Sequence, residues 1–294
     1  MDIKDMRLFI TMAEEKNLTR AAEKNGYTQS GASHILKNLE KELGFTLFVR
    51  TKKGLVLTPN GERILPLTRR VLSAHCLFEQ EVAAICGIQK GHIIIGSYMS
   101  ASIHWLPTAL GKFYSQYPDI TVEIREGNFS EICSWLENGI IDFGITGQII
   151  SEKMEWLPLK KEPFLAICPL DSPYAGEAYF DLKNLEKEPC ILLDQTEEPD
   201  LTRQIRNLGI RPISNFSSLN DHAMMAMVEH KLGISILPEL VIRGRLQNLA
   251  ALPLQPPIER TLGIRVPSLR EASPAARLFI KCLQDTVNEL ETPN

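Results

Sequence analysis

The chain has 294 residues, of which 44% are hydrophobic and 23% are charged. This composition is ordinary for a globular protein, and the length predicts two or three compact units. The first ten residues mix charged and apolar side chains, so we expect no secretion signal there and predict a cytoplasmic protein. The six cysteines lack any metal-binding spacing, so neither a zinc site nor a disulfide framework is predicted.

The charge is unevenly distributed along the chain. Residues 1–90 hold 14 Lys and Arg against 10 Asp and Glu, whereas the remaining residues hold 18 against 26. The first part therefore carries +4 and the second part −8, which together give the net charge of −4. This excess does not by itself establish nucleic-acid binding, but it leaves that function open to the basic head and nearly removes it from the acidic body.

Three helices are predicted in the head. The first follows from the apolar spacing in KDMRLFITMAEEK, and the second, in NLTRAAEK, has Asn17 or Thr19 available as its N-terminal cap. Asn25 and Gly26 then predict a tight turn, and residues 30–43 form a helix with one apolar and one polar face. Two short helices joined by such a turn are typical of a helix-turn-helix, whose second helix enters the DNA major groove.

The polar face of this last helix carries side chains suited to DNA. Short hydroxyls can approach base edges or phosphates, an amide can pair with adenine, and a lysine can neutralise a phosphate. Taken alone, such a face more often contacts only water, so the interpretation depends on the neighbouring segments. The candidate DNA-contacting residues here are Gln29, Ser30, Ser33, His34 and Lys37.

A basic hairpin is predicted directly afterwards. Gly44 ends the helix, and FTLFVR and GLVLT are typical of two short strands, with Gly54 in the turn between them. Beside a recognition helix, such a hairpin forms a wing whose tip reaches the sugar-phosphate backbone. Without that helix it would be only a basic surface hairpin. The candidate residues of the wing are Arg50, Lys52 and Lys53.

These segments resemble the winged helix-turn-helix of LysR-type transcriptional regulators. The resemblance rests on LEKELG at 39–44, LFVR at 47–50 and LTPNG at 57–61, which are specific in order and spacing. Ser30 and His34 depart from the commonest family pattern, which has proline and arginine at these positions. The resemblance extends over essentially the whole chain, and it implies a regulator that binds double-stranded DNA and a small-molecule effector.

A long helix is predicted from Pro59 to about Cys86, with Thr58 as its cap. Its apolar positions recur every seven residues, as in a coiled coil, which predicts a homodimer and suits paired DNA half-sites. The alternative is a helix packed on its own domain; the resemblance favours the dimer and implies a homotetramer. The repeating positions are Ile64, Val71, Phe78 and Ile85.

The rest of the chain alternates short apolar strands with helices, which predicts an α/β sheet. By the resemblance, this body is a two-lobed, periplasmic-binding-protein-like effector domain. The predicted fold is thus an α+β multidomain chain with an N-terminal winged helix-turn-helix at 1–58, a linker helix and hinge at 59–90, and the effector domain at 91–294. Lobe I covers about 91–165 and 265–294, and lobe II covers about 166–264.

The effector is expected between the lobes, at the carboxyl ends of strands where helix N-termini point. Hydroxyls beside free N–H groups suit a carboxylate, so an anionic effector is predicted. For any single serine, a role as a helix cap only is equally consistent with the sequence. The candidate effector-binding residues are Ser100, Ser102, Asn128, Phe129, Thr146, Gly147 and Ser218.

No catalytic residue, metal or cofactor is predicted. The chain lacks GxSxG, Walker A, HExxH and a G-x-G-x-x-G following a strand, and its six histidines show no metal-ligand spacing. The preferred function is a transcriptional regulator in which the effector shifts the population of two states. Two alternatives stay open, namely a metabolite-binding protein whose head only oligomerises, and an enzyme that uses the cleft.

Overall fold

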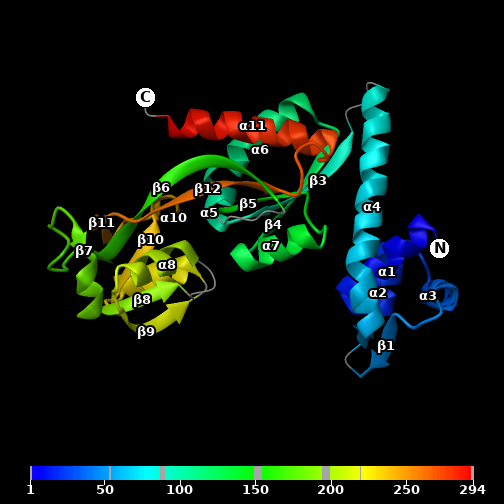
Figure 1. Ribbon diagram of the computed structural model, residues 1–294, viewed down its shortest axis with the longest axis horizontal. Coiled ribbons are helices and arrows are strands. Elements are labelled where there is room, and N and C mark those ends of the chain that lie inside the picture. Colours follow the sequence, from blue (N-terminus) through cyan, green and yellow to red (C-terminus); the bar gives the residue numbers. More distant parts are fainter. Residues whose placement is uncertain are drawn as a thin grey trace. The chain divides into compact units, whose positions relative to one another are not determined.

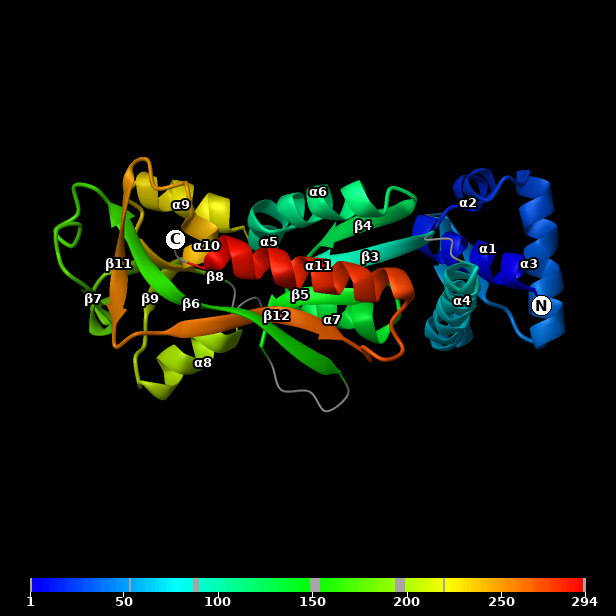
Figure 2. The same ribbon diagram turned by 90° about the horizontal axis from the view of Figure 1, so that it is seen from above.

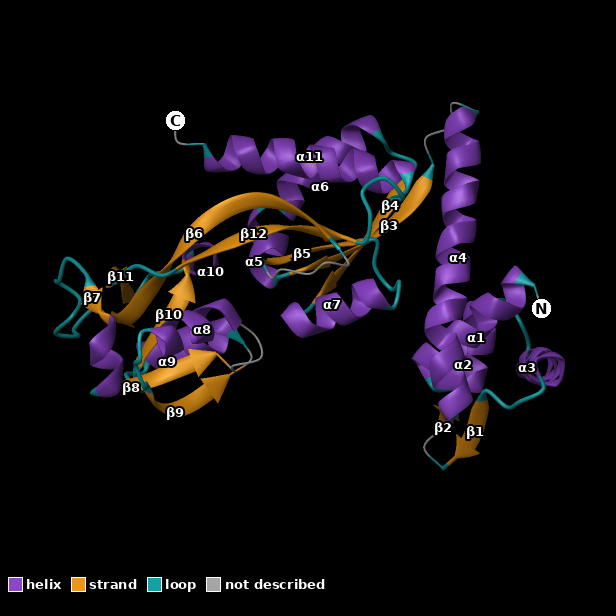
Figure 3. Ribbon diagram, in the orientation of Figure 1, coloured by secondary structure: helices purple, strands orange, loops and turns teal. Residues whose placement is uncertain are grey.

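The computed structural model describes residues 2–52, 54–86, 90–148, 154–193, 199–218 and 220–292. The chain divides into two compact units, one made of residues 1–88 with 137–140 and the other of residues 89–136 with 141–294. Helices and strands occur in both units, as Figures 1 and 3 show. Among the described residues, no helix is long and apolar enough to cross a membrane.

The first unit begins with three short helices. Asn17 caps the second helix by accepting hydrogen bonds from the N–H groups of Thr19 and Arg20, so of the two predicted candidates it is Asn17 that forms the cap. Thr28 caps the third helix, and Gly44 ends it with a φ of 80°. The helices are α1 (Ile3–Glu15), α2 (Leu18–Lys24) and α3 (Gln29–Leu43).

The predicted wing is an antiparallel hairpin of β1 (Phe48–Thr51) and β2 (Gly54–Leu57). Its entry is fixed by α3, because Glu40 Oε1 accepts hydrogen bonds from the N–H groups of Leu47 at 2.7 Å and Phe48 at 3.2 Å. At the base of the hairpin, the rings of Phe9 and Phe48 meet edge to face at 5.6 Å in the apolar core.

Gly54 is required where the wing meets the end of α1. The N–H of Leu55 donates to the carbonyl oxygen of Lys16 at 2.8 Å, which draws the hairpin against that helix end. Gly54 has a φ of 114°, and a Cβ at this position would lie 2.3 Å from Lys16 O. A side chain would therefore meet both an unfavourable backbone conformation and a rigid backbone atom.

A single long helix, α4 (Pro59–Ile85), follows the wing. Thr58 caps the N-terminus of this helix. Its hydroxyl accepts a hydrogen bond from Gly61 N at 3.0 Å and donates one to Thr46 O at 2.7 Å. Large apolar side chains stay exposed along the helix, and Phe78 and Ile85 are 67% and 84% exposed. The other large apolar side chains that are exposed among the described residues of α4 are Leu67, Val71 and Val82.

The second unit opens with the three parallel strands of lobe I. After the first strand the structure has two helices that meet at Trp105, whose side chain is fully buried. The strands are β3 (Gly91–Ser97), β4 (Ile120–Glu126) and β5 (Phe143–Gly147). The helices are α5 (Met99–His104), α6 (Leu106–Gln116), α7 (Phe129–Glu137) and the C-terminal α11 (Pro274–Glu291), which the sequence analysis did not predict.

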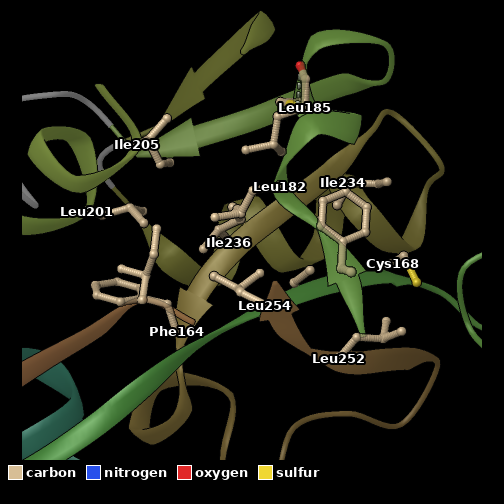
Figure 4. Close-up of a cluster of buried hydrophobic side chains, with 14 residues drawn as sticks. Phe164, Cys168, Leu182, Leu185, Leu201, Ile205, Ile234, Ile236, Leu252 and Leu254 are labelled. Carbon is tan, nitrogen blue, oxygen red and sulfur yellow. Dashed lines mark hydrogen bonds between the residues drawn. The ribbon is translucent and has the colours of Figure 1, made fainter. Parts of the chain in front are cut away.

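Lobe II surrounds a second set of strands. Its core, drawn in Figure 4, gathers Phe164, Leu201 and Ile236 from three different elements. The strands are β7 (Phe180–Asp181), β8 (Pro189–Leu193), β9 (Ile213–Ser218), β10 (Ile234–Pro238) and β11 (Leu249–Gln255). The helices are the 3-10 helix η1 (Leu182–Glu186) and the α-helices α8 (Pro199–Asn207), α9 (Asp221–Glu229) and α10 (Glu239–Ile242).

Two long strands connect the lobes, as Figure 2 shows from above. β6 (Glu155–Pro169) pairs antiparallel with β12 (Glu259–Val266) along the full length of β12, with a register shift between Leu262 and Gly263. The continuous strand order is β4-β3-β5-β12-β6-β10-β8-β9. The two lobes therefore belong to one hydrogen-bonded sheet.

Candidate DNA-binding face and effector pocket

The predicted DNA-contacting residues of α3 lie on the face opposite its buried side chains. Ala32, Leu36 and Leu39 are buried in the core of the first unit. Ser33 is half-buried, whereas the other four candidates are exposed. These four are Gln29, Ser30, His34 and Lys37.

The wing contacts this face directly. Arg50 Nη2 donates a hydrogen bond of 3.3 Å to Ser33 Oγ, and Ser30 Oγ lies 3.1 Å from Thr28 Oγ1. Lys52 is exposed at the turn, while Lys53 lies outside the described residues. Hydroxyl, imidazole and cationic groups thus share one exposed surface, and this is the combination that phosphate and base contacts need.

The second unit contains a cavity of about 320 Å³. Its walls come from the loops after β3 and β4, the start of α9, β10 and both crossing strands. Leu201, Ile236 and Phe164 belong to the lobe II core in Figure 4 and also form part of the apolar wall of the cavity. The cavity is therefore built from residues of both lobes.

The sequence-predicted effector residues divide into two groups. Ser100 and Asn128 line the cavity, and Ser100 is only 6% exposed. No hydrogen bond joins the hydroxyl of Ser100 to a described residue. The remaining five are not among the described lining residues, and they are Ser102, Phe129, Thr146, Gly147 and Ser218.

Local hydrogen bonds account for two of these five. Thr146 is fully buried and donates to Gly147 O at 2.9 Å. The hydroxyl of Ser218 accepts from Asn220 N at 3.1 Å, next to the start of α9. Ser102 Oγ is buried without a partner among the described residues.

The sequence analysis missed Arg260, a residue of β12 that lines the cavity and is 4% exposed. Its Nε donates to Glu162 Oε1 at 2.9 Å, and the other oxygen of Glu162 accepts from Leu240 N at 2.7 Å. The guanidinium also lies over the rings of Tyr98 and Phe164, at 5.6 and 5.7 Å from their centroids. The sequence gives little sign of it, because Glu259, Thr261 and Arg265 are polar residues of the same strand.

Three carboxylates line the cavity as well. Glu126 and Glu131 are both exposed, and Glu131 Oε2 accepts from Asn128 N at 3.0 Å at the start of α7. Asp221 begins α9, and no described donor reaches its carboxylate. Burial raises the pKa of Asp221, against the opposing effects of Arg260 and His222.

A second ionic cluster lies around Glu291, near the end of α11. This carboxylate accepts from Trp105 Nε1 at 2.9 Å and from both terminal nitrogens of Arg243 at 2.8 and 2.9 Å, and it also pairs with Lys160. Burial raises the pKa of Glu291, but the hydrogen bonds from Arg243, Lys160 and Trp105 outweigh it and lower the pKa to about 2. In the described part of the chain, no group of side chains could hold a metal ion.

The two units match two known sequence families. Residues 3–62 match the bacterial regulatory helix-turn-helix protein, lysR family, and residues 87–288 match the LysR substrate binding domain. The HTH-type transcriptional regulator YvbU of Bacillus subtilis (strain 168) is 32% identical over 97% of this chain and 98% of its own.

Solved structures with the same architecture agree with this match. A full-length OxyR from Pseudomonas aeruginosa, a variant with one cysteine replaced by aspartate, is 25% identical, with a TM-score of 0.75 over 98% of this chain and 97% of its own. CbnR in complex with its target DNA is 20% identical, with a TM-score of 0.69 over 97% of this chain and 100% of its own, and this likeness concerns the fold alone. A winged helix-turn-helix joined to a two-lobed domain with an internal cavity defines a DNA-binding transcriptional regulator with an effector-binding domain. The chain belongs to the LysR family of these regulators.

Proposed function

We propose that this regulator binds operator DNA through the exposed face of α3 and the wing, and that a small molecule in the cavity of the second unit modulates this binding. The observation that carries the proposal is the cavity itself, which both lobes line and which contains a buried serine hydroxyl without a described partner. A ligand that binds one lobe arrangement better than another shifts their populations by its differential affinity.

The DNA-contact proposal rests on exposure and chemistry. Gln29, Ser30 and His34 lie at the start of α3, which is the part of a recognition helix that reaches base edges. Lys37 and Lys52 are exposed cations suited to phosphates, and Arg50 reaches the same surface from the wing. Lys53 remains a proposed contact from its sequence position alone.

The proposed dimer forms through α4. Phe78 and Ile85 are exposed one heptad apart, and large apolar side chains exposed in a row along one helix are typical of an interaction surface. LysR regulators form oligomers. For this chain we propose that the dimers associate further into a tetramer. Binding to chromosomal DNA would take place in the cytoplasm of a bacterium.

A mobility-shift experiment tests the main proposal. The purified chain, at physiological salt, is titrated against DNA from the region upstream of its own gene and against a shuffled sequence of the same composition. We expect a preference for the upstream DNA of at least about a thousandfold in affinity. Equal affinity for both DNAs would overturn the proposal and favour a head that serves only in oligomerisation.

A second measurement addresses an enzymatic role for the cavity. Small molecules that raise the melting temperature of the protein are incubated with it and then quantified by mass spectrometry. A regulator returns its effector unchanged, whereas protein-dependent conversion would support the enzyme alternative.

A further inference from the structure

The wing contacts α3 at two polar points that lie on the same side of the helix. Arg50 Nη2 donates to Ser33 Oγ at 3.3 Å. Glu40 Oε1 accepts from the backbone N–H groups of Leu47 at 2.7 Å and Phe48 at 3.2 Å. Ser33 and Glu40 are seven residues apart, which is about two turns of an α-helix, and both are half-buried. The wing is therefore held both in the first half of α3 and near its end.

The two contacts hold different parts of the wing. The bond to Ser33 orients only the side chain of Arg50, whereas Glu40 binds the main chain where β1 begins. Leu47 is fully buried and Phe48 is 8% exposed, and backbone N–H groups in such surroundings need an acceptor. Glu40 supplies a charged one, which gives stronger hydrogen bonds than a neutral acceptor. This carboxylate thus fixes the path of the backbone from α3 into the wing.

Other bonds hold the wing to different parts of the first unit. The N–H of Leu55 donates to Lys16 O at 2.8 Å, next to the end of α1. The hydroxyl of Thr58 donates to Thr46 O at 2.7 Å, in the loop before β1. These bonds fix the wing against α1 and against its own entry loop, while Glu40 fixes it against the helix whose exposed face is the proposed base-reading surface.

We propose that Glu40 is a positioning residue for DNA binding. It holds the wing in a fixed place relative to α3, so that the cations of the wing meet phosphates in the same register in which α3 meets base edges. A specific complex needs both contacts at once and gains from a wing that is already in place. A nonspecific complex depends on phosphate charge in any register. This inference rests on the proposed function, since it explains how the proposed DNA contacts are held together.

Three substitutions separate the charge of Glu40 from its hydrogen bonds. Glu40→Gln removes the charge but keeps a carbonyl oxygen that can accept both N–H bonds. Glu40→Ala removes the charge and the acceptor. Glu40→Asp keeps the charge on a side chain that is one methylene shorter and falls short of the two N–H groups. Asp2→Ala is the matched control for Glu40→Ala, because it also removes a carboxylate that accepts from a backbone N–H, in the capping box of α1.

The measured quantity is a ratio of two affinities of the full-length protein. One is for DNA from the region upstream of its own gene, and the other is for a shuffled sequence of the same composition. A loss of folded protein lowers both affinities equally, and a change of charge acts on both through the phosphates, so both effects cancel in the ratio. We expect the ratio to fall about tenfold or more in Glu40→Ala and Glu40→Asp. It should stay at the wild-type value in Glu40→Gln and Asp2→Ala.

Hydrogen exchange of the Leu47 amide reports whether the bond to residue 40 is present. Exchange should be slow in the wild type and in Glu40→Gln, and faster in Glu40→Ala and Glu40→Asp. Equal ratios in Glu40→Gln and Glu40→Ala would overturn the proposal. A ratio that falls in Glu40→Gln and is kept in Glu40→Asp would assign the effect to charge and overturn it as well. If Glu40→Ala does not fold, the comparison of Glu40→Asp with Glu40→Gln decides.

The wild-type protein distinguishes the two possible failures. If it prefers the upstream DNA and the Glu40 variants keep that preference, the positioning role fails and the regulator proposal stands. If the wild type binds both DNAs equally, the regulator proposal fails and the positioning role fails with it.

Discussion

Arg50 Nη2 donates a hydrogen bond of 3.3 Å to Ser33 Oγ, and this bond connects the wing to the first half of α3. The hydroxyl of Ser33 is half-buried, so one of its lone pairs is committed to the wing while its own hydrogen remains available. Under the proposed DNA contact, base selection at this position would depend on both α3 and the wing, because the two bonded residues are 17 positions apart in the chain.

Ser33→Ala should change the preference among operator sequences more than it changes nonspecific affinity. Loss of one hydroxyl contact and of the bond that orients Arg50 should cost about 1 kcal/mol on the preferred operator. Competition mobility shifts with single-base operator variants and with random-sequence DNA measure both quantities. An equal loss on both kinds of DNA would assign Ser33 to the phosphates instead.

Lys52→Ala should weaken binding to all DNA sequences alike. An exposed lysine at the tip of a wing has the reach of a phosphate contact, and removing one such contact should reduce the slope of log K against log salt by about one. The measurement is affinity at several salt concentrations. Lys4→Ala, an exposed lysine of α1, is the control and should leave the slope unchanged.

Gly54→Ala should loosen the wing, because the new Cβ would meet Lys16 O and the backbone would hold an unfavourable φ. The expected destabilisation is about 2 kcal/mol or more. Gly26→Ala is the matched control: its φ is 73° but no atom lies within 4 Å of the new Cβ, so it should cost only about 1 kcal/mol. Hydrogen exchange of the Leu55 amide reports the difference. Similar exchange in both variants would rule out the steric argument.

Phe78→Asp should disrupt oligomers that form through α4. The Phe78 side chain is 67% exposed, and a charge at the centre of an apolar helix contact is costly. Light scattering at micromolar concentration should show a lower mass for the variant than for the wild type. Leu170→Asp, at a residue that is 60% exposed in the second unit, should leave the mass unchanged. An unchanged mass in Phe78→Asp would place the interface elsewhere.

Low pH should destabilise the fold of the second unit, because it protonates the carboxylate of Glu291. Its pKa is lowered from 4.5 to about 2, so its stabilisation is complete above pH 4.5 and is lost as the pH falls toward 2. This lowering of the pKa corresponds to about 3 kcal/mol in the free energy of unfolding.

Glu291→Gln should therefore lower the melting temperature at pH 7 and flatten its fall between pH 5 and pH 3. Fluorescence of the three tryptophans, all in the second unit, reports this unfolding. Glu289→Gln, on the same helix and 66% exposed, is the control. A pH dependence that is identical in the wild type and Glu291→Gln would show that the carboxylate titrates normally.

Much of the head could be predicted from the sequence because its signals are local. The apolar faces of three helices, the Asn25-Gly26 turn and the Gly44 stop all lie within a few residues of the structure they determine. The same local patterning identified α4 and the alternating strands of the body. The winged helix-turn-helix and the α/β effector domain are confirmed.

The residues that line the cavity could not be predicted as fully, because strands that are far apart in the sequence pair to create it. Arg260 and Glu162 are 98 residues apart, and only the antiparallel pairing of β6 with β12 brings them together. The caps of the helices could not be predicted either. The expectation that a ligand binds where a strand ends and a helix begins points to the start of α9. It does not reveal that Asn220 Oδ1 already accepts from the backbone N–H groups there.

The paired strands β6 and β12 limit how the lobes can respond to a ligand. Because the two connecting strands are hydrogen-bonded to each other, we expect them to resist rotation of one lobe against the other and to allow bending. Its weak point is the register shift between Leu262 and Gly263, where the ladder is locally interrupted. We therefore expect a ligand that contacts both lobes to change the curvature of this two-stranded ribbon, and to do so mainly at Leu262 and Gly263.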